Sequence, residues 1–122
     1  AGARTLAKSI HMLLPEQSVT LLTGMMADKD VRGFLRIILP YVHRVVVTRP
    51  DNPRAMNPFD LGSLIEETFG QQMEKVVIEP DIEKAVDEAL ALTPEEGAVI
   101  CAGSLYMLGS VRHWVLEGVK SD

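Results

Sequence analysis

The clearest structural signal in the sequence is the segment Val45-Val46-Val47-Thr48-Arg49-Pro50-Asp51-Asn52-Pro53-Arg54. Its three consecutive β-branched apolar residues are typical of a strand buried on both faces. The chain then becomes polar, and Pro50 and Pro53 each fix φ and remove a backbone donor, so neither a strand nor a helix continues through them. The segment therefore predicts a core strand that ends in a rigid loop carrying a carboxylate, an amide and a guanidinium group.

On either side of this segment, short apolar runs alternate with amphipathic stretches. Strands are predicted over residues 19–23, 45–47, 76–78 and 98–102. Helices are predicted over residues 3–14, 31–39, 58–69, 82–90 and 105–115, where apolar residues recur every three or four positions. Asp28, Asn57 and Asp81 are the expected N-caps, and Gly70 is expected to end the third helix.

Apolar strands that alternate with helices imply a mainly parallel sheet with helices on both faces. We therefore predict a Rossmann-like, doubly wound α/β fold. A doubly wound sheet normally opens with a strand, whereas this chain begins with Ala1 and a helical pattern. The first strand is thus expected to be truncated, with the chain a piece of a longer protein.

Composition limits the class of protein. The 122 residues suffice for one domain, and 47% apolar and 24% charged residues are ordinary for a globular protein. A net charge of −5 argues against a nucleic-acid partner. No apolar run approaches the roughly 20 residues that span a bilayer, and no signal-peptide pattern is present, so we expect a cytoplasmic protein without a membrane partner. The single cysteine, Cys101, excludes an internal disulfide and is expected to be a buried, inert thiol.

Three polar loops follow the carboxyl ends of predicted strands, and a parallel topology brings all three to one sheet edge, where ligands bind in open α/β folds. In the first loop, Gly24 permits a tight turn. Lys29 lies in the first turn of a helix, where the helix dipole disfavours a cation. A ligand carboxylate or phosphate explains Lys29, and an ion pair with Asp28 or Asp30 explains it equally well.

The second loop carries Asp51, Asn52 and Arg54. The planar guanidinium of arginine suits bidentate recognition of a carboxylate, although a pair between Arg54 and Asp51 that only stiffens the loop is an alternative. The third loop, Gly103-Ser104, offers a hydroxyl and backbone N–H groups at a helix N-terminus, which can bind an anion or simply cap the helix.

Other catalytic signatures are absent from the sequence. There is no phosphate loop ending in Gly-Lys-Ser/Thr and no Gly-x-Gly-x-x-Gly. His11, His43 and His113 lack metal-ligand spacing, and no Ser/His/Asp arrangement is suggested. The residues thus predict a module that binds and orients an anionic small molecule, with no catalytic residue and no metal site of its own.

Three motifs occur in a recognisable order: Gly24-Met25-Met26-Ala27-Asp28-Lys29-Asp30, then Val46-Val47-Thr48-Arg49-Pro50-Asp51-Asn52-Pro53-Arg54-Ala55, then Gly103-Ser104-Leu105-Tyr106. Together they resemble the C-terminal domain of the folylpolyglutamate synthase/dihydrofolate synthase family, within the Mur ligase superfamily. The resemblance covers essentially the whole chain. It implies that residues 1–122 are the glutamate-binding C-terminal domain, a fragment of a larger ligase.

By this resemblance, the full enzyme would use ATP and Mg²⁺ to activate a folate or pteroate carboxylate as an acyl phosphate, and would join L-glutamate to it as an amide. A missing N-terminal domain of the same chain would hold the phosphate loop, the Mg²⁺ ligands and the folate pocket. An Asp-Gly-Ala-His-Asn-Pro segment would directly precede Ala1. The enzyme is expected to be a monomer, and the isolated fragment is expected to be inactive.

The resemblance also assigns glutamate-binding residues. Ser104 would hold the incoming glutamate. Arg54, with Asp51 and Asn52, matches a loop that binds the incoming amino acid in related peptidoglycan-precursor ligases, and Lys29 matches a lysine near that substrate. Two alternatives stay open: the C-terminal domain of a peptidoglycan-precursor amino-acid ligase, and a non-catalytic α/β interaction module.

Overall fold

The computed structural model describes residues 2–13, 18–27 and 30–103 of the chain. The helices are α1 (Gly2–Leu13), α2 (Val31–Ile38), α3 (Pro58–Phe69) and α4 (Ile82–Leu92), with short 3-10 turns η1 (Leu39–Tyr41) and η2 (Gly70–Gln72). The strands are β1 (Val19–Gly24), β2 (Arg44–Val47), β3 (Lys75–Ile78) and β4 (Ala98–Gly103). All four predicted strands and four of the predicted helices are confirmed, while the helix predicted over 105–115 lies outside the described residues. Within the described ranges, no helix has the length and apolarity needed to cross a membrane.

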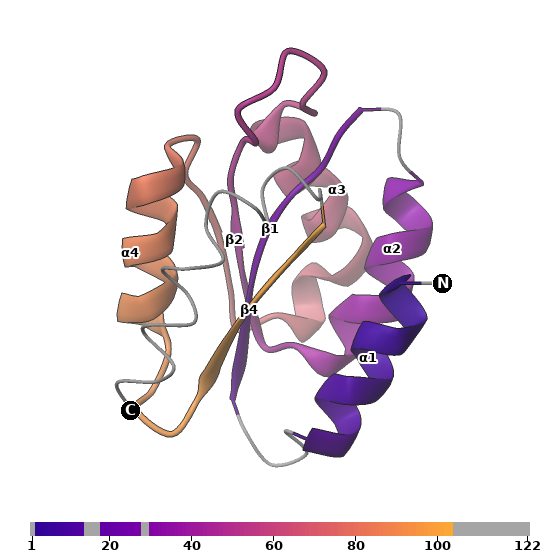
Figure 1. The fold of residues 1–122 in the computed structure, drawn as a ribbon, viewed down its shortest axis with the longest axis vertical. Helices are drawn as coiled ribbons and strands as arrows, with labels where there is room; N and C mark the ends of the chain where they lie inside the picture. Colours follow the sequence, from indigo (N-terminus) through magenta and orange to yellow (C-terminus); the bar gives the residue numbers. More distant parts are fainter. Residues whose placement is uncertain (1, 14–17, 28–29, 104–122) are drawn as a thin grey trace.

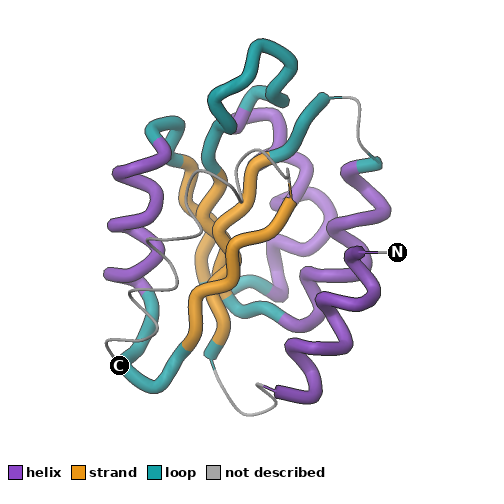
Figure 2. Tube along the Cα trace, in the orientation of Figure 1, coloured by secondary structure: helices purple, strands orange, loops and turns teal. Residues whose placement is uncertain are grey.

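The four strands form one parallel sheet in the order β3-β2-β1-β4. Helices α1, α2 and α3 lie on one side of this sheet and α4 lies on the other (Figures 1 and 2). The prediction of a doubly wound, Rossmann-like α/β fold is therefore confirmed. The two strands richest in valine and leucine, β1 and β2, are the central ones, and every residue in both is buried.

Alternate residues of the central strands supply two separate cores, because successive side chains of a strand point to opposite faces. Val45 and Val47 join the larger cluster, which includes residues of α1, α2 and α3. Val46 and Leu22 join the smaller cluster, which includes residues of α4. The uninterrupted valine run is thus needed to cover both faces of the sheet.

The helix caps agree with the sequence at two of three positions. The side chains of Asn57 and Asp81 accept hydrogen bonds from backbone N–H groups at the starts of α3 and α4, as predicted. The prediction that Asp28 caps α2 is wrong: Asp30 is the cap and accepts a bond of 3.1 Å from the Gly33 N–H, because the helix begins only at Val31. Gly70 does end α3, but through a right-handed conformation that continues into η2.

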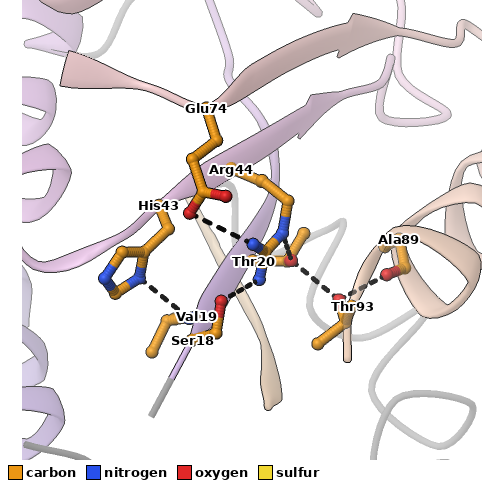
Figure 3. Close-up of polar contacts among 8 residues, drawn as sticks. All are labelled: Ser18, Val19, Thr20, His43, Arg44, Glu74, Ala89 and Thr93. Carbon is orange, nitrogen blue, oxygen red and sulfur yellow. Dashed lines mark hydrogen bonds and ion pairs between the residues drawn. The ribbon is translucent and has the colours of Figure 1, made fainter. Parts of the chain in front are cut away.

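A buried arginine ties together the amino ends of the strands (Figure 3). Arg44, at the start of β2, is only 6% exposed. Its Nε donates to Thr20 Oγ1 at 2.9 Å, one terminal nitrogen donates to Ser18 Oγ at 2.6 Å, and the other meets Glu74 at 3.4 Å. These bonds join the start of β2 to the segments that begin β1 and precede β3, at the edge opposite the polar loops.

The same network reaches α4. The Thr93 hydroxyl lies 2.7 Å from Thr20 Oγ1 and 2.6 Å from the Ala89 carbonyl oxygen. Because each hydroxyl has one proton, Thr93 donates to the carbonyl and accepts from Thr20, while Thr20 accepts from Arg44. The resulting chain of hydrogen bonds fixes the end of α4 against the sheet.

The thiol of Cys101 is predicted to react slowly. Cys101 is half-buried and not fully buried as expected; it packs against the smaller core from β4, and this burial raises its pKa to about 12. Since the thiolate is the reactive form, labelling with iodoacetamide at pH 8 should be about a thousandfold slower in the folded chain than in urea. The same shift makes the free energy of unfolding depend on pH. Above about pH 9 the thiol ionises in the unfolded chain but stays protonated in the folded one, so the free energy of unfolding should fall as pH rises. A Cys101→Ala variant should lack this part of the alkaline decrease, and labelling at the unfolded rate would contradict the prediction.

Candidate functional site

The carboxyl ends of three strands meet at one edge of the sheet. Thr23 at the end of β1 is in register with Val47 of β2 and with Ala102 of β4, and Gly24 is in register with Gly103. The prediction that the polar loops leave from a common edge is therefore confirmed for their described parts. In Figure 1 this edge is at the top, below the protruding magenta loop that follows β2.

The loops after β1 and β2 are joined directly. Met26 and Ala55 form an antiparallel bridge. The Ala27 N–H donates to the Arg54 carbonyl oxygen at 2.8 Å, and the Met56 N–H donates to the Met25 carbonyl oxygen at the same distance. The backbone of Arg54 is consequently fixed beside the described part of the first loop.

Asn52 shapes the second loop from within. Its Oδ1 accepts a 2.8 Å hydrogen bond from the Arg54 N–H, and its backbone carbonyl accepts one of 3.0 Å from the Ala55 N–H. This arrangement is an Asx turn, in which the side chain imitates the backbone of a turn. The side-chain Nδ2 group has no partner among the described residues, so it is the part of Asn52 that can donate to a ligand oxygen.

The charged groups of this loop are exposed. Asp51 and Arg54 both lie at the surface. Within ranges 2–13, 18–27 and 30–103, Asp51 makes no ion pair, so the alternative in which it pairs with Arg54 to stiffen the loop is not observed. The other two predicted ligand residues, Lys29 and Ser104, lie outside the described residues.

The structure adds a residue that sequence reasoning missed. Thr23 is fully buried, and its Oγ1 has no hydrogen-bond partner in the described structure. It lies beside Gly103, whose φ of +126° is the one positive φ among the described residues. Gly24, which was expected to allow a tight turn, stays within β1, so the unusual backbone is at the end of β4 instead. The only signal for Thr23 in the sequence is a hydroxyl residue at the end of an apolar strand.

Gly103 is predicted to be intolerant of a side chain. A Cβ atom there would lie 2.6 Å from the Gly24 carbonyl oxygen, and its φ is one that other residues rarely adopt. Gly103→Ala should therefore lower the free energy of unfolding by about 1–3 kcal/mol in urea titrations. The matched control is Gly70→Ala, where φ is −53° and the nearest atom is the end of the Glu66 side chain. Equal stabilities for the two variants would refute this account.

The chemistry available at this edge is the binding of an anion. It offers an arginine, an amide N–H group and backbone at the ends of strands. No group of three histidine, cysteine, aspartate or glutamate side chains in the described structure could hold a metal ion. The arginine, the amide N–H group and the backbone groups of this edge can bind and orient an anionic ligand.

Comparison with known proteins gives the family. The family model of the Mur ligase glutamate ligase domain matches residues 1–105, which is most of the chain. The chain belongs to this family. The sheet edge described above is thus part of a Mur ligase glutamate ligase domain.

Individual relatives are larger proteins. The dihydrofolate synthase/folylpolyglutamate synthase of Mycobacterium tuberculosis is 26% identical over 125 residues, covering 92% of this chain and 25% of that protein. A structure of folylpolyglutamate synthase from the same species, complexed with ADP and AMPPCP, superposes with a TM-score of 0.80 at 26% identity, covering 93% of this chain and 27% of that one. The structure of folylpolyglutamate synthase from Thermotoga maritima gives a TM-score of 0.72 at 27% identity, covering 96% of this chain and 25% of that one. The chain thus spans about a quarter of the length of these relatives.

Proposed function

We propose that this Mur ligase domain is the C-terminal, glutamate-binding part of an ATP-dependent folate–glutamate ligase. The observation that carries the proposal is the match of residues 1–105 to the glutamate ligase domain family. The relatives that cover nearly the whole chain are folylpolyglutamate synthases, and they support folate as the second substrate. Residues 1–122 would then be one domain of a longer enzyme.

The reaction has two steps. A carboxylate oxygen of folate or pteroate attacks the γ-phosphorus of ATP, which releases ADP and leaves an acyl phosphate. The amino group of L-glutamate then attacks the acyl carbon, phosphate leaves, and the amino group loses a proton as the amide forms. The second step requires a neutral amine held close to the acyl carbon, and that positioning is the task we assign to this domain.

The polar loops supply the means of orientation. Glutamate brings two carboxylates, and the exposed guanidinium of Arg54 can bind one of them through two hydrogen bonds. Asn52 can add a donor from Nδ2, and Asp51 can accept from the ammonium group before it is deprotonated. Ser104 and Lys29 complete the proposed glutamate site.

We assign the binding of ATP and Mg²⁺ mainly to an N-terminal ATPase domain of the longer enzyme, which belongs to the same polypeptide. One relative was solved with ADP and AMPPCP, and another, from Yersinia pestis, with AMPPNP and a Mn ion. Closure of the two domains would bring glutamate to the acyl phosphate and exclude water from it. We place the enzyme in the cytoplasm, where its substrates are soluble, and propose that it acts as a monomer.

The test is a ligase assay on the full-length protein that contains this chain. Release of phosphate from MgATP should require both L-glutamate and either dihydropteroate or tetrahydrofolate, and a glutamyl amide should accumulate. The 122-residue chain alone should hydrolyse no ATP. Turnover that instead depends on a peptidoglycan precursor and its amino acid would assign the domain to the other ligase class, and metal-dependent hydrolysis by the chain alone would overturn the division between domains.

A further inference from the structure

A second cationic feature lies away from the polar loops, in a groove between α1 and α2. The groove has a volume of about 400 Å³, which is within the range of small-molecule sites. Its charged lining consists of Arg4 and Lys8 from α1 and Arg36 from α2. No ion pair in the described structure joins any of the three to a carboxylate.

The surrounding charge is strongly segregated. Helices α1 and α2 carry four arginine or lysine residues and no acidic residue. Helices α3 and α4 carry acidic residues, with Lys84 as their one cation. A basic groove in a chain with a net charge of −5 is therefore a local feature and does not reflect the overall composition.

Neighbouring cations on α1 and on α2 repel one another, although Arg36 also lies in the last turn of α2, where the helix dipole favours a cation. Arg4 and Lys8 are four residues apart on α1, as are Arg32 and Arg36 on α2, and like charges at this spacing repel. An anion bound between Arg4, Lys8 and Arg36 would offset the repulsion between Arg4 and Lys8.

The rest of the groove is apolar and aromatic. Ala7, Ile37 and Pro40 contribute carbon surface. The phenol ring of Tyr41, 38% exposed, meets the imidazole of His11 edge to face with a centroid separation of 5.8 Å. A ligand that fits this lining has a planar or apolar body as well as negative charge.

We propose that the α1–α2 groove binds a small organic polyanion, in which two or more phosphate or carboxylate groups adjoin a ring. The anionic groups pair with Arg4, Lys8 and Arg36, and the ring covers Ile37 and packs against Tyr41. This site is separate from the proposed glutamate site, because it is built from α1, α2 and η1 and contains none of the loop residues at the carboxyl edge.

The test is binding to the ¹⁵N-labelled 122-residue chain, followed by amide chemical shifts. ADP represents a phosphorylated ring compound, benzene-1,3,5-tricarboxylate represents a polycarboxylate, and adenosine provides a ring without charge. At least one of the two anions should shift the amides of residues 4–11 and 36–41, and adenosine should not. Raising NaCl from about 0.05 to about 0.5 M should weaken the binding, since exposed charges are screened.

Charge reversal separates this site from the others. Lys8→Glu and Arg36→Glu should each weaken binding about tenfold or more. The control is Arg32→Glu, which alters the same helix one turn away and lies outside the groove, and Arg54→Ala should leave this binding unchanged while affecting glutamate use. The proposal is overturned if neither anion shifts the amides of either segment, or if Arg32→Glu weakens the binding as much as Arg36→Glu does. Neither outcome bears on the ligase function.

Discussion

Replacing Arg54 by alanine in the intact ligase is expected to raise the KM for glutamate by about 10- to 100-fold, because a hydrogen bond to a charged group contributes about 1.5–3 kcal/mol. The KM for ATP should change little, since the nucleotide is assigned to another domain. Initial rates measured against each substrate in turn give both values. Arg54→Lys should recover only part of the loss, because an ammonium group cannot bind a carboxylate through a planar pair of donors.

The matched control for Arg54 is Arg49→Ala. Arg49 is exposed and lies near the start of the same loop, so its removal changes the local charge by the same amount. If both variants raise the KM for glutamate equally, the effect is one of general charge and the assigned contact is wrong. Unchanged glutamate dependence in Arg54→Ala would contradict the site directly.

The second large effect is expected at the other edge of the sheet. Arg44→Met keeps most of the buried chain volume but removes the hydrogen bonds to Thr20 and Ser18. Since these are charge-assisted bonds in a largely buried setting, the loss should be about 2–4 kcal/mol in urea denaturation. Arg32→Met, at an exposed position of α2, should change stability by less than about 0.5 kcal/mol.

A variant of Glu74 tests which contacts of Arg44 contribute most to the free energy of unfolding. Its side chain is 61% exposed and its contact with Arg44 is 3.4 Å, so the ion pair should contribute little. Glu74→Gln is therefore expected to cost less than about 1 kcal/mol, far below the effect of Arg44→Met. Similar losses for the two variants would show that the ion pair, and not the bonds to Thr20 and Ser18, holds the strand ends together.

Much of the candidate site could be anticipated because it depends on local signals and on one topological rule. The valine run at 45–47 fixes a buried strand, and Pro50 and Pro53 end it. Parallel strands then place Thr23, Val47 and Ala102 at one edge, as found. The sequence predicts Asn52 as a ligand residue but does not reveal its Asx turn, because asparagine is suited to both roles.

Other features depend on segments far apart in the chain. Nothing near Arg44 indicates that it will meet Ser18 and Thr20, since the contact exists only because β2 lies beside β1. The misplaced cap at Asp28 has a different cause: Asp28 and Asp30 both satisfy the local rule, and the start of α2 at Val31 makes Asp30 the cap.

The sequence by itself determined the element types, the parallel α/β class and the family motifs, because apolar periodicity, proline and capping residues act over a few positions. Tertiary structure alone decided the strand order, the bridge between Met26 and Ala55, the positive φ at Gly103, the arginine network and the basic groove. These features arise where residues tens of positions apart come into contact, and the free energy of such contacts depends on how whole helices and strands pack.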